Sequence, residues 1–301
     1  MTTDSTLAAM STAMEPAKPL PSLARRMLGN PALVAGLTLI GIVVAMAALA
    51  PLISPHDPYA QDLTTRLIPP FWHAKGTWDH VLGTDNLGRD YLSRVIYGAR
   101  ISLLIGISVM IISGLIGTTL GLVAGYFGGR IDMLVNFIIT ARLAMPVVLV
   151  ALAVVAMIGG SLTVVILTLG LLKWDRFAVV MRSATQQVRS LDYVTAAEAA
   201  GASRTRVLLA EILPNVLPHL IVVATVEAGS AILLEAALSF LGLGVQPPLP
   251  SWGLMIAEAK NFMFFSFWLI AIPGSALALL VLGINLAGDG LRDVLAPEER
   301  G

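Results

Sequence analysis

Residues 192–214 read DYVTAAEAAGASRTRVLLAEILP and separate two long apolar segments of the chain. The part from Val194 to Ala200 consists almost entirely of strong helix formers, and Gly201 permits a sharp turn between two short helices. Pro214 falls where the next apolar helix begins, a position at which its missing N–H donor is harmless. The stretch therefore predicts an ordered helix–turn–helix loop, which favours docking to another protein over simple tethering.

The composition of the chain is that of a membrane protein. Of its 301 residues, 56% are hydrophobic and 13% are charged, with a mean hydropathy of +0.83, whereas a soluble domain carries about 25% charged residues. The formal net charge is zero and no basic tract is present, so nothing supports binding of nucleic acid. The absence of cysteine excludes disulfides, thiolate metal sites and cysteine nucleophiles.

Six apolar stretches are long enough to cross a bilayer, which requires about 20 residues in a helix. They are continuously apolar rather than alternating, so we expect an all-α, polytopic membrane protein with six transmembrane helices. The stretches are residues 31–53, 101–124, 132–158, 161–181, 216–240 and 266–287. The first is longer than the apolar core of a signal peptide, about 7–15 residues, which favours an uncleaved anchor.

The placement of lysine and arginine predicts the orientation in the membrane. With the N-terminus inside, ten of these residues lie on the cytosolic side and six outside, and Arg25 and Arg26 directly flank the first span. Four spans precede the 192–214 loop, which places it on the side of the N-terminus. We expect a cytosolic tail at 1–28, a first transmembrane helix at 29–54, a periplasmic segment at 55–98, a transmembrane core at 99–290 and a cytosolic tail at 291–301.

No motif for catalysis or nucleotide binding is present. None of the four lysines has the spacing Gly-x-x-x-x-Gly-Lys of a phosphate loop, so any ATP hydrolysis must occur on another subunit. The histidines His56, His73, His80 and His219 lack the spacing of a zinc protease. Three of them lie in the 55–98 segment, where solvated surface is the simplest explanation. We expect no catalytic residue, metal site or cofactor in this chain.

The stretch from Arg89 to Leu103 has apolar residues at helical spacing, and Asp90 and Arg94 lie four residues apart. This pattern predicts an amphipathic helix at the outer membrane surface that leads into the second span. Within that span, the series Gly117, Gly121 and Gly125 allows another helix to approach closely. Packing inside the bundle is favoured over a subunit interface.

Several charged residues interrupt the apolar spans, and each costs about 2.5–3.5 kcal/mol at the centre of a membrane helix. They are Arg142, Lys173, Asp175, Arg176, Glu227 and Glu235. We expect them to face the bundle interior or water, and we single out Asp175, Arg176, Glu227 and Glu235 as candidates for a translocation path. Structural hydrogen bonding is an equally good interpretation.

With these residues in view, the loop resembles the permease signature of binding-protein-dependent ABC importers. That signature is Glu-Ala-Ala, three residues, Gly, nine residues, Ile-x-Leu-Pro. Here Ala196, Ala197, Gly201, Leu213 and Pro214 match at the right spacing. Thr195 replaces the signature glutamate and Glu211 replaces the isoleucine.

Other motifs are similar to the dipeptide, oligopeptide and nickel importer class. They are the APLISPHDP stretch at 50–58, LGTDNLGRDYLSR at 82–94, SFLGLGVQPPLPSW at 239–252 and GDGLRD at 288–293. The resemblance implies a type I importer permease of the bacterial inner membrane that moves peptides, or a related solute such as chelated nickel. It also implies a second permease, ATPase subunits that bind ATP and magnesium, and a periplasmic solute-binding protein.

In that family the loop seats a coupling helix in a groove of the ATPase. The resemblance assigns this role to Ala196, Ala197, Glu198, Ala200, Gly201, Ala202, Arg204, Leu213 and Pro214. The alternative is a secondary transporter driven by an ion gradient, with Glu227 and Asp175 as ion-coupled groups. A membrane-embedded enzyme is a third possibility, and would require turnover without ATPase partners.

Overall fold

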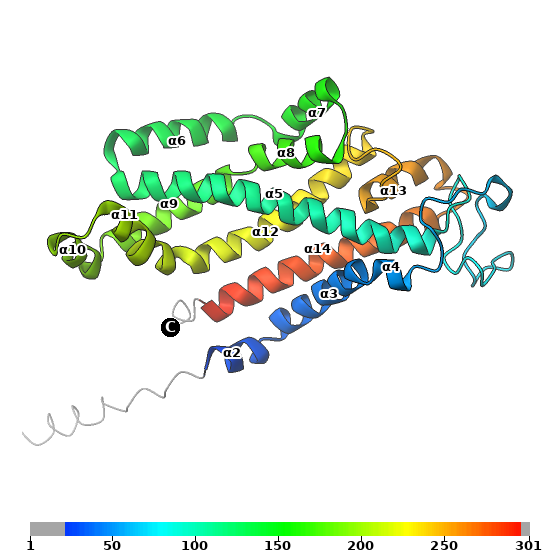
Figure 1. Cartoon of the computed structure of the whole chain (residues 1–301), viewed down its shortest axis with the longest axis horizontal. Coiled ribbons are helices and arrows are strands. Elements are labelled where there is room, and N and C mark those ends of the chain that lie inside the picture. The colour runs from blue at the N-terminus through cyan, green and yellow to red at the C-terminus, as the bar shows by residue number, and fades with distance from the viewer. Residues whose placement is uncertain (1–21, 296–301) are drawn as a thin grey trace, which may run out of the picture.

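The computed structural model of the chain describes residues 22–295. The expected all-α class is confirmed, since the described residues form helices and a single isolated bridge between Thr84 and Asp90. The longer helices run along an elongated bundle (Figure 1), with α10 at one end and α13 at the other. We refer to these as the α10 end and the α13 end.

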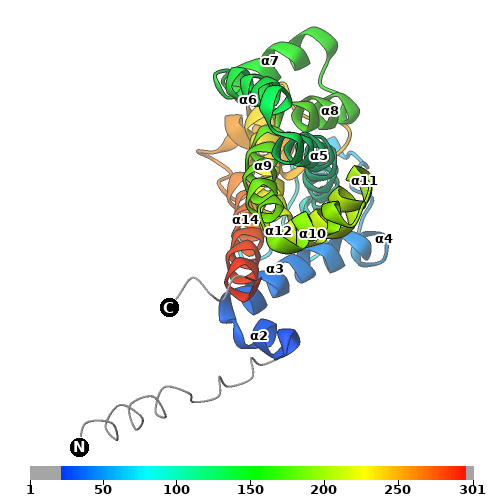
Figure 2. The same cartoon turned by 90° about the vertical axis from the view of Figure 1, so that its left-hand side faces the viewer.

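The helices follow one another in a simple order along the chain. They are α2 (Leu23–Gly29), α3 (Pro31–Ala48), α4 (Ala50–Ile53), η1 (Leu63–Thr65), α5 (Tyr91–Phe127), α6 (Gly129–Leu143), α7 (Val147–Ile158), α8 (Leu162–Leu172), α9 (Asp175–Arg189), α10 (Asp192–Ala199), α11 (Arg204–Arg206), the π-helical η2 (Val207–Ile212), α12 (Leu213–Phe240), α13 (Trp252–Ala259), η3 (Lys260–Phe262) and α14 (Trp268–Leu295). The C-terminal end of α14 and the α2 segment lie toward the α10 end (Figures 1 and 2).

Four single helices are long and apolar enough to span a membrane: α3, α5, the continuous helix 204–240 and α14. A fifth span is formed if α6 and α7, which are bent by 78° at their junction, count together. The remaining expected span, 161–181, is divided into α8 and α9 at Lys173–Trp174. The break falls where charged residues interrupt the apolar run. The side chain of Arg142 donates to the carbonyl of Leu172 at this break, which satisfies a group freed by it.

The helix expected at 89–103 exists as the beginning of α5 and leads into the second span, as predicted, but it does not lie at the membrane surface. Tyr91, Val95 and Ala99 are buried in one cluster with Trp252 of α13, so protein rather than lipid covers this stretch. Asp90 and Arg94, which lie four residues apart, do not pair with each other, because Arg94 pairs with Asp85 and Glu258. Asp90 caps α5 by accepting from the backbone N–H of Ser93 at 2.8 Å.

Helical structure extends into both segments that the sequence predicts to be tails. Within the expected tail 1–28, residues 1–21 lie outside the described part, and α2 occupies Leu23–Gly29. At the other end, α14 continues through Leu295, into the segment 291–301 that is expected to be the second tail. Residues 296–301 lie outside the described part.

The helices α5 and α9 pack with their backbones in contact. A Cβ atom added at Gly117, Gly121 or Gly125 would lie 2.2–2.7 Å from the carbonyl oxygens of Trp174, Ala178 and Arg182, respectively. The glycine series therefore serves packing inside the bundle, as expected. Gly36 gives α3 the same close approach to α14.

The outer surface of the bundle is strongly apolar. Large side chains on several helices are more than half exposed, among them Ile42, Leu115 and Phe137. Water does not favour such a surface, so it is suited to lipid or to another membrane subunit.

Replacing Gly121 by valine is expected to lower the free energy of unfolding by about 1–3 kcal/mol, because the added atoms overlap the backbone of α9. Gly41→Val is the control, since a Cβ atom there meets nothing within 4 Å. Unfolding of the purified chain in mixed detergent would measure both. Equal stability of the two variants would contradict the proposed packing.

Candidate functional site

At the α10 end, the 192–214 stretch forms the helix–turn–helix that the sequence predicts. Gly201 has φ +85°, a conformation that side chains disfavour, and it turns the chain between α10 and α11. The N–H of Ala202 donates to the carbonyl of Ala197 at 3.0 Å across this turn. Beneath it, Val194 and Val207 are fully buried. The turn is therefore ordered and held to the bundle.

Polar and aromatic contacts connect this turn to the end of α5. The hydroxyl of Tyr126 donates to a carboxylate oxygen of Glu198 at 2.8 Å. The guanidinium groups of Arg189 and Arg204 lie 5.7 and 5.8 Å from the ring centres of Tyr126 and Phe127. These residues line a cavity of about 470 Å³ between α5 and the turn.

The residues assigned to coupling divide into two groups. Seven lie on the helix–turn–helix and are exposed or half-buried: Ala196, Ala197, Glu198, Ala200, Gly201, Ala202 and Arg204. Leu213 and Pro214 instead begin α12, after the π-helical η2. Pro214 is the second residue of α12 and follows η2 within the continuous helix 204–240, so its missing N–H falls at the change from π- to α-helix.

A second candidate site lies in the middle of the bundle, where α8, α9 and α12 meet. The ammonium of Lys173 lies 2.7 Å from one carboxylate oxygen of Glu227, and a guanidinium nitrogen of Arg176 lies 3.2 Å from the other. Lys173 also donates to Ser230 at 2.9 Å. The side chain of Glu227 is 2% exposed, so its charge is compensated almost entirely by these cations.

These groups line a cavity of about 520 Å³. Three cationic side chains and two carboxylates face it, together with small and apolar residues. The charged residues are Arg142, Lys173, Asp175, Arg176 and Glu227. A cavity of this size with charges of both signs suits a small ligand that itself carries both charges.

Of the four candidate path residues, Asp175, Arg176 and Glu227 line this cavity, and Glu235 does not. Glu235 is fully buried two turns further along α12 and accepts from Ser239 at 2.7 Å and Ser251 at 3.0 Å. The hydrogen bond from Ser251, the N-cap of α13, fastens α12 to the start of that helix. Sequence reasoning left Lys173 and Arg142 out of this group, although both interrupt apolar spans.

The α13 end holds a network of buried charges that the sequence did not reveal. Arg89 pairs with Asp85 at 2.7 Å and with Glu258 at 3.1 Å. Arg94 pairs with the same two carboxylates. Glu258 belongs to α13, far away in the sequence, so no local pattern connects it to Asp85. The network fastens the 55–90 segment to α5 and α13.

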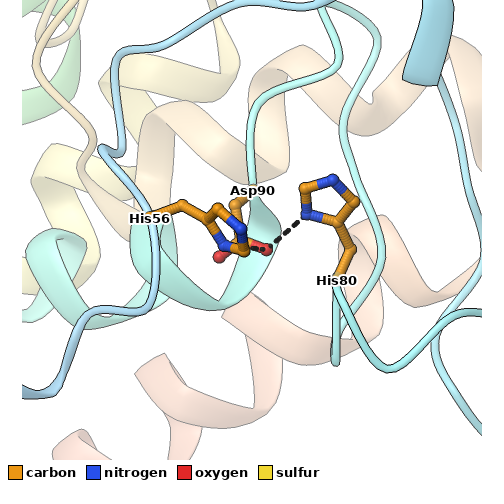
Figure 3. A group of neighbouring side chains, drawn as sticks. All are labelled: His56, His80 and Asp90. Atoms are coloured by element: carbon orange, nitrogen blue, oxygen red, sulfur yellow. Dashed lines mark hydrogen bonds and ion pairs between the residues drawn. The ribbon is translucent and has the colours of Figure 1, made fainter.

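His56, His80 and Asp90 gather beside this network, with one ligand atom from each within 4.8 Å of the others. Figure 3 shows both imidazole rings directed at the Asp90 carboxylate. The side chain of His80 is 13% exposed and that of His56 is 35% exposed. They are not the solvated surface residues that the sequence analysis expected.

Comparison with known proteins identifies the family. The profile of binding-protein-dependent transport system inner membrane components matches residues 117–301, which include both candidate sites. The chain belongs to this family. The N-terminal transmembrane domain of oligopeptide transport permease C matches residues 22–70. The chain is thus a membrane-embedded transport permease subunit and not an enzyme, and the predicted class is confirmed.

Individual relatives agree with this assignment. The dipeptide transport system permease protein DppC of Haemophilus influenzae is 43% identical over 263 residues, or 87% of this permease and 89% of that protein. The di/tripeptide transport system permease protein DppC of Pseudomonas aeruginosa is 43% identical over 269 residues, or 89% of each chain. A solved structure of the MetNI methionine ABC transporter, in an inward-facing conformation, has a TM-score of 0.58 at 18% identity. It covers 67% of this chain and 97% of the solved chain, which supports the importer permease fold.

Replacing Glu227 by alanine is expected to lower the free energy of unfolding by about 3–5 kcal/mol, because Lys173 is left buried without its counter-charge. Arg176→Ala is the control, since its side chain is 64% exposed and an exposed ion pair contributes at most about 1 kcal/mol. Unfolding in mixed detergent measures both variants. The double variant with Lys173→Met and Glu227→Leu should regain most of the loss, and a double variant less stable than Glu227→Ala would contradict the pairing.

Proposed function

We propose that this permease is one half of the membrane channel of an ATP-driven importer of short peptides. A di- or tripeptide carries an ammonium group at one end and a carboxylate at the other. The mid-bundle cavity offers partners for both. The carboxylates of Glu227 and Asp175 could pair with the ammonium group, and the cationic side chains could pair with the carboxylate: Arg142, Lys173 and Arg176. This mixed-charge cavity carries the proposal, and the peptide-transporting relatives support it.

In the proposed assembly, the α10 end faces the cytosol and docks on an ATPase subunit. The exposed helix–turn–helix around Gly201 supports this, because it is rigid and its outer surface is not covered by the rest of the chain. Both described ends of the chain lie toward the same side, in agreement with the predicted cytosolic tails. ATP and magnesium would be bound by the ATPase partners.

The α13 end would then face the periplasm of a bacterial cell and receive peptide from a solute-binding protein. A second permease would complete the wall of the cavity, which this chain lines with residues of the α6–α7 region, of the α8–α9 break and of α12. When the ATPases close, they would move the α10–α11 turn. Because α9 runs from the cavity at Asp175 to Arg189, just before α10, that movement would reach the cavity through a single helix.

The coupling role is tested by Gly201→Pro, which is expected to abolish ATP-driven uptake while membrane insertion stays intact. Proline cannot adopt the observed φ of +85°, so the turn must change shape. Gly242→Pro is the control, because Gly242 has φ +82° at the other end of α12. ATP-driven uptake by the transporter and retention of the ATPase by the purified complex are both measured. Loss with Gly201→Pro and retention with Gly242→Pro is expected, and equal retention by both would contradict the docking surface.

Proteoliposomes that contain the complete transporter should accumulate labelled dipeptide only when ATP is supplied. Proteoliposomes that contain this chain alone should not respond to a proton or sodium gradient, because a single permease lacks half of the cavity wall. Uptake by the lone chain under an ion gradient would overturn the proposal. A set of competitor solutes, including single amino acids and a nickel chelate, would establish the substrate class.

A further inference from the structure

We propose that His56, His80 and Asp90 form a binding site for a divalent transition-metal ion, with Zn²⁺ as the reference ion, at the α13 end of the molecule. The three residues come from separate segments: the loop after α4, the loop before residue 83, and the N-cap of α5 (Figure 3). The inference does not depend on which solute the permease transports.

The donor set and its spacing fit such an ion. The Nδ1 atoms of His80 and His56 lie 2.9 and 3.7 Å from the same oxygen of Asp90, Oδ1. Donors that bind zinc at about 2.0–2.1 Å in a tetrahedron lie about 3.3 Å from one another. Small side-chain rotations are therefore enough to place the ligands. Two imidazoles and a carboxylate are the donors that zinc and similar ions prefer when thiolates are absent.

The carboxylate of Asp90 is held in place by groups behind it. Its other oxygen, Oδ2, accepts from the N–H and from the hydroxyl of Ser93, at 2.8 and 2.7 Å. The side chain is 1% exposed. Oδ1 is consequently directed at the two histidines, in the way that surrounding hydrogen bonds orient the ligands of known metal sites.

An unsatisfied atom points to a ligand rather than to packing alone. Nδ1 of His56 is buried and has no hydrogen-bond partner, and its distance of 3.7 Å from Asp90 is too long for a hydrogen bond. Buried polar atoms normally have partners. A metal ion between His56, His80 and Asp90 satisfies this atom.

Asp79 lies on the other side of the two rings. Its carboxylate is 78% exposed, and its two oxygens lie 3.7 Å from Nε2 of His56 and 3.8 Å from Nε2 of His80. With Nδ1 of each histidine on the ion, Asp79 is placed to accept from the Nε2–H groups and so to orient the rings, and water would take the remaining coordination position. The bound ion would tie together parts of the 55–90 segment, in which η1 and the Thr84–Asp90 bridge are the only regular elements described. We infer that its role is to brace this segment against α5.

The test uses the full-length chain, purified through a tag without histidine and stripped with a chelator. Titration with ZnCl₂, read by calorimetry and by the metal content after dialysis, should show one tightly bound ion per chain. His56→Ala should weaken binding at least tenfold. This variant is informative because Nδ1 of His56 has no hydrogen bond to lose. His80→Ala should weaken binding similarly.

Matched controls are His73→Ala, which removes another histidine of the same segment, and His219→Ala on α12. Both should bind zinc as the unaltered chain does. Zinc should also raise the Tm of the unaltered chain and of both controls, and leave that of His56→Ala unchanged. Absence of stoichiometric binding, or equal weakening by His73→Ala and His56→Ala, would overturn the site.

Discussion

The close packing of α5 against α9 is the contact on which the rest of the structure depends. Three glycines of α5 bring its backbone against carbonyl groups of α9, with no side chain between them. This contact sets the position of α9 along the bundle. With a rise of 1.5 Å per residue, the 15 residues of α9 cover about 22 Å. Its two ends therefore place the charged cavity and the helix–turn–helix at a defined separation.

The charges inside the bundle have two different roles that the sequence alone does not distinguish. Glu227 faces a cavity and is compensated by Lys173 and Arg176, whereas Glu235 accepts from two serine hydroxyls in closed packing. Both glutamates lie on α12, two turns apart. The difference arises from what stands opposite them: α8 and α9 open a cavity beside Glu227, and α13 covers Glu235. For this reason Glu227, and not Glu235, is the glutamate of α12 that is suited to contact a transported solute in the proposed function.

The two ends of the molecule are ordered by different means. At the α10 end, buried valines and cation–π contacts hold a short turn whose outer surface stays exposed. At the α13 end, a segment with little regular structure is tied down by buried salt bridges between Asp85, Arg89, Arg94 and Glu258. Charge pairs of this kind are expensive to bury. Because the segment has few backbone hydrogen bonds of regular secondary structure, these side-chain pairs supply contacts that hold it to α5 and α13.

The amino-acid sequence by itself determined the membrane class, the positions of most helices, the turn at Gly201 and the family. These features follow from continuous apolar runs, local helix propensity and a motif of fixed spacing, all of which act over short distances along the chain. The charges near Lys173 mark an interruption in 161–181, but tertiary structure alone decided that the helix breaks there. It also decided that 89–103 is the buried start of α5 and that His56 and His80 meet at Asp90. In each case the outcome depends on partners distant in sequence, such as Arg142 at the broken helix or Trp252 beside α5. No local pattern encodes such a partner, because helix packing brings it into place.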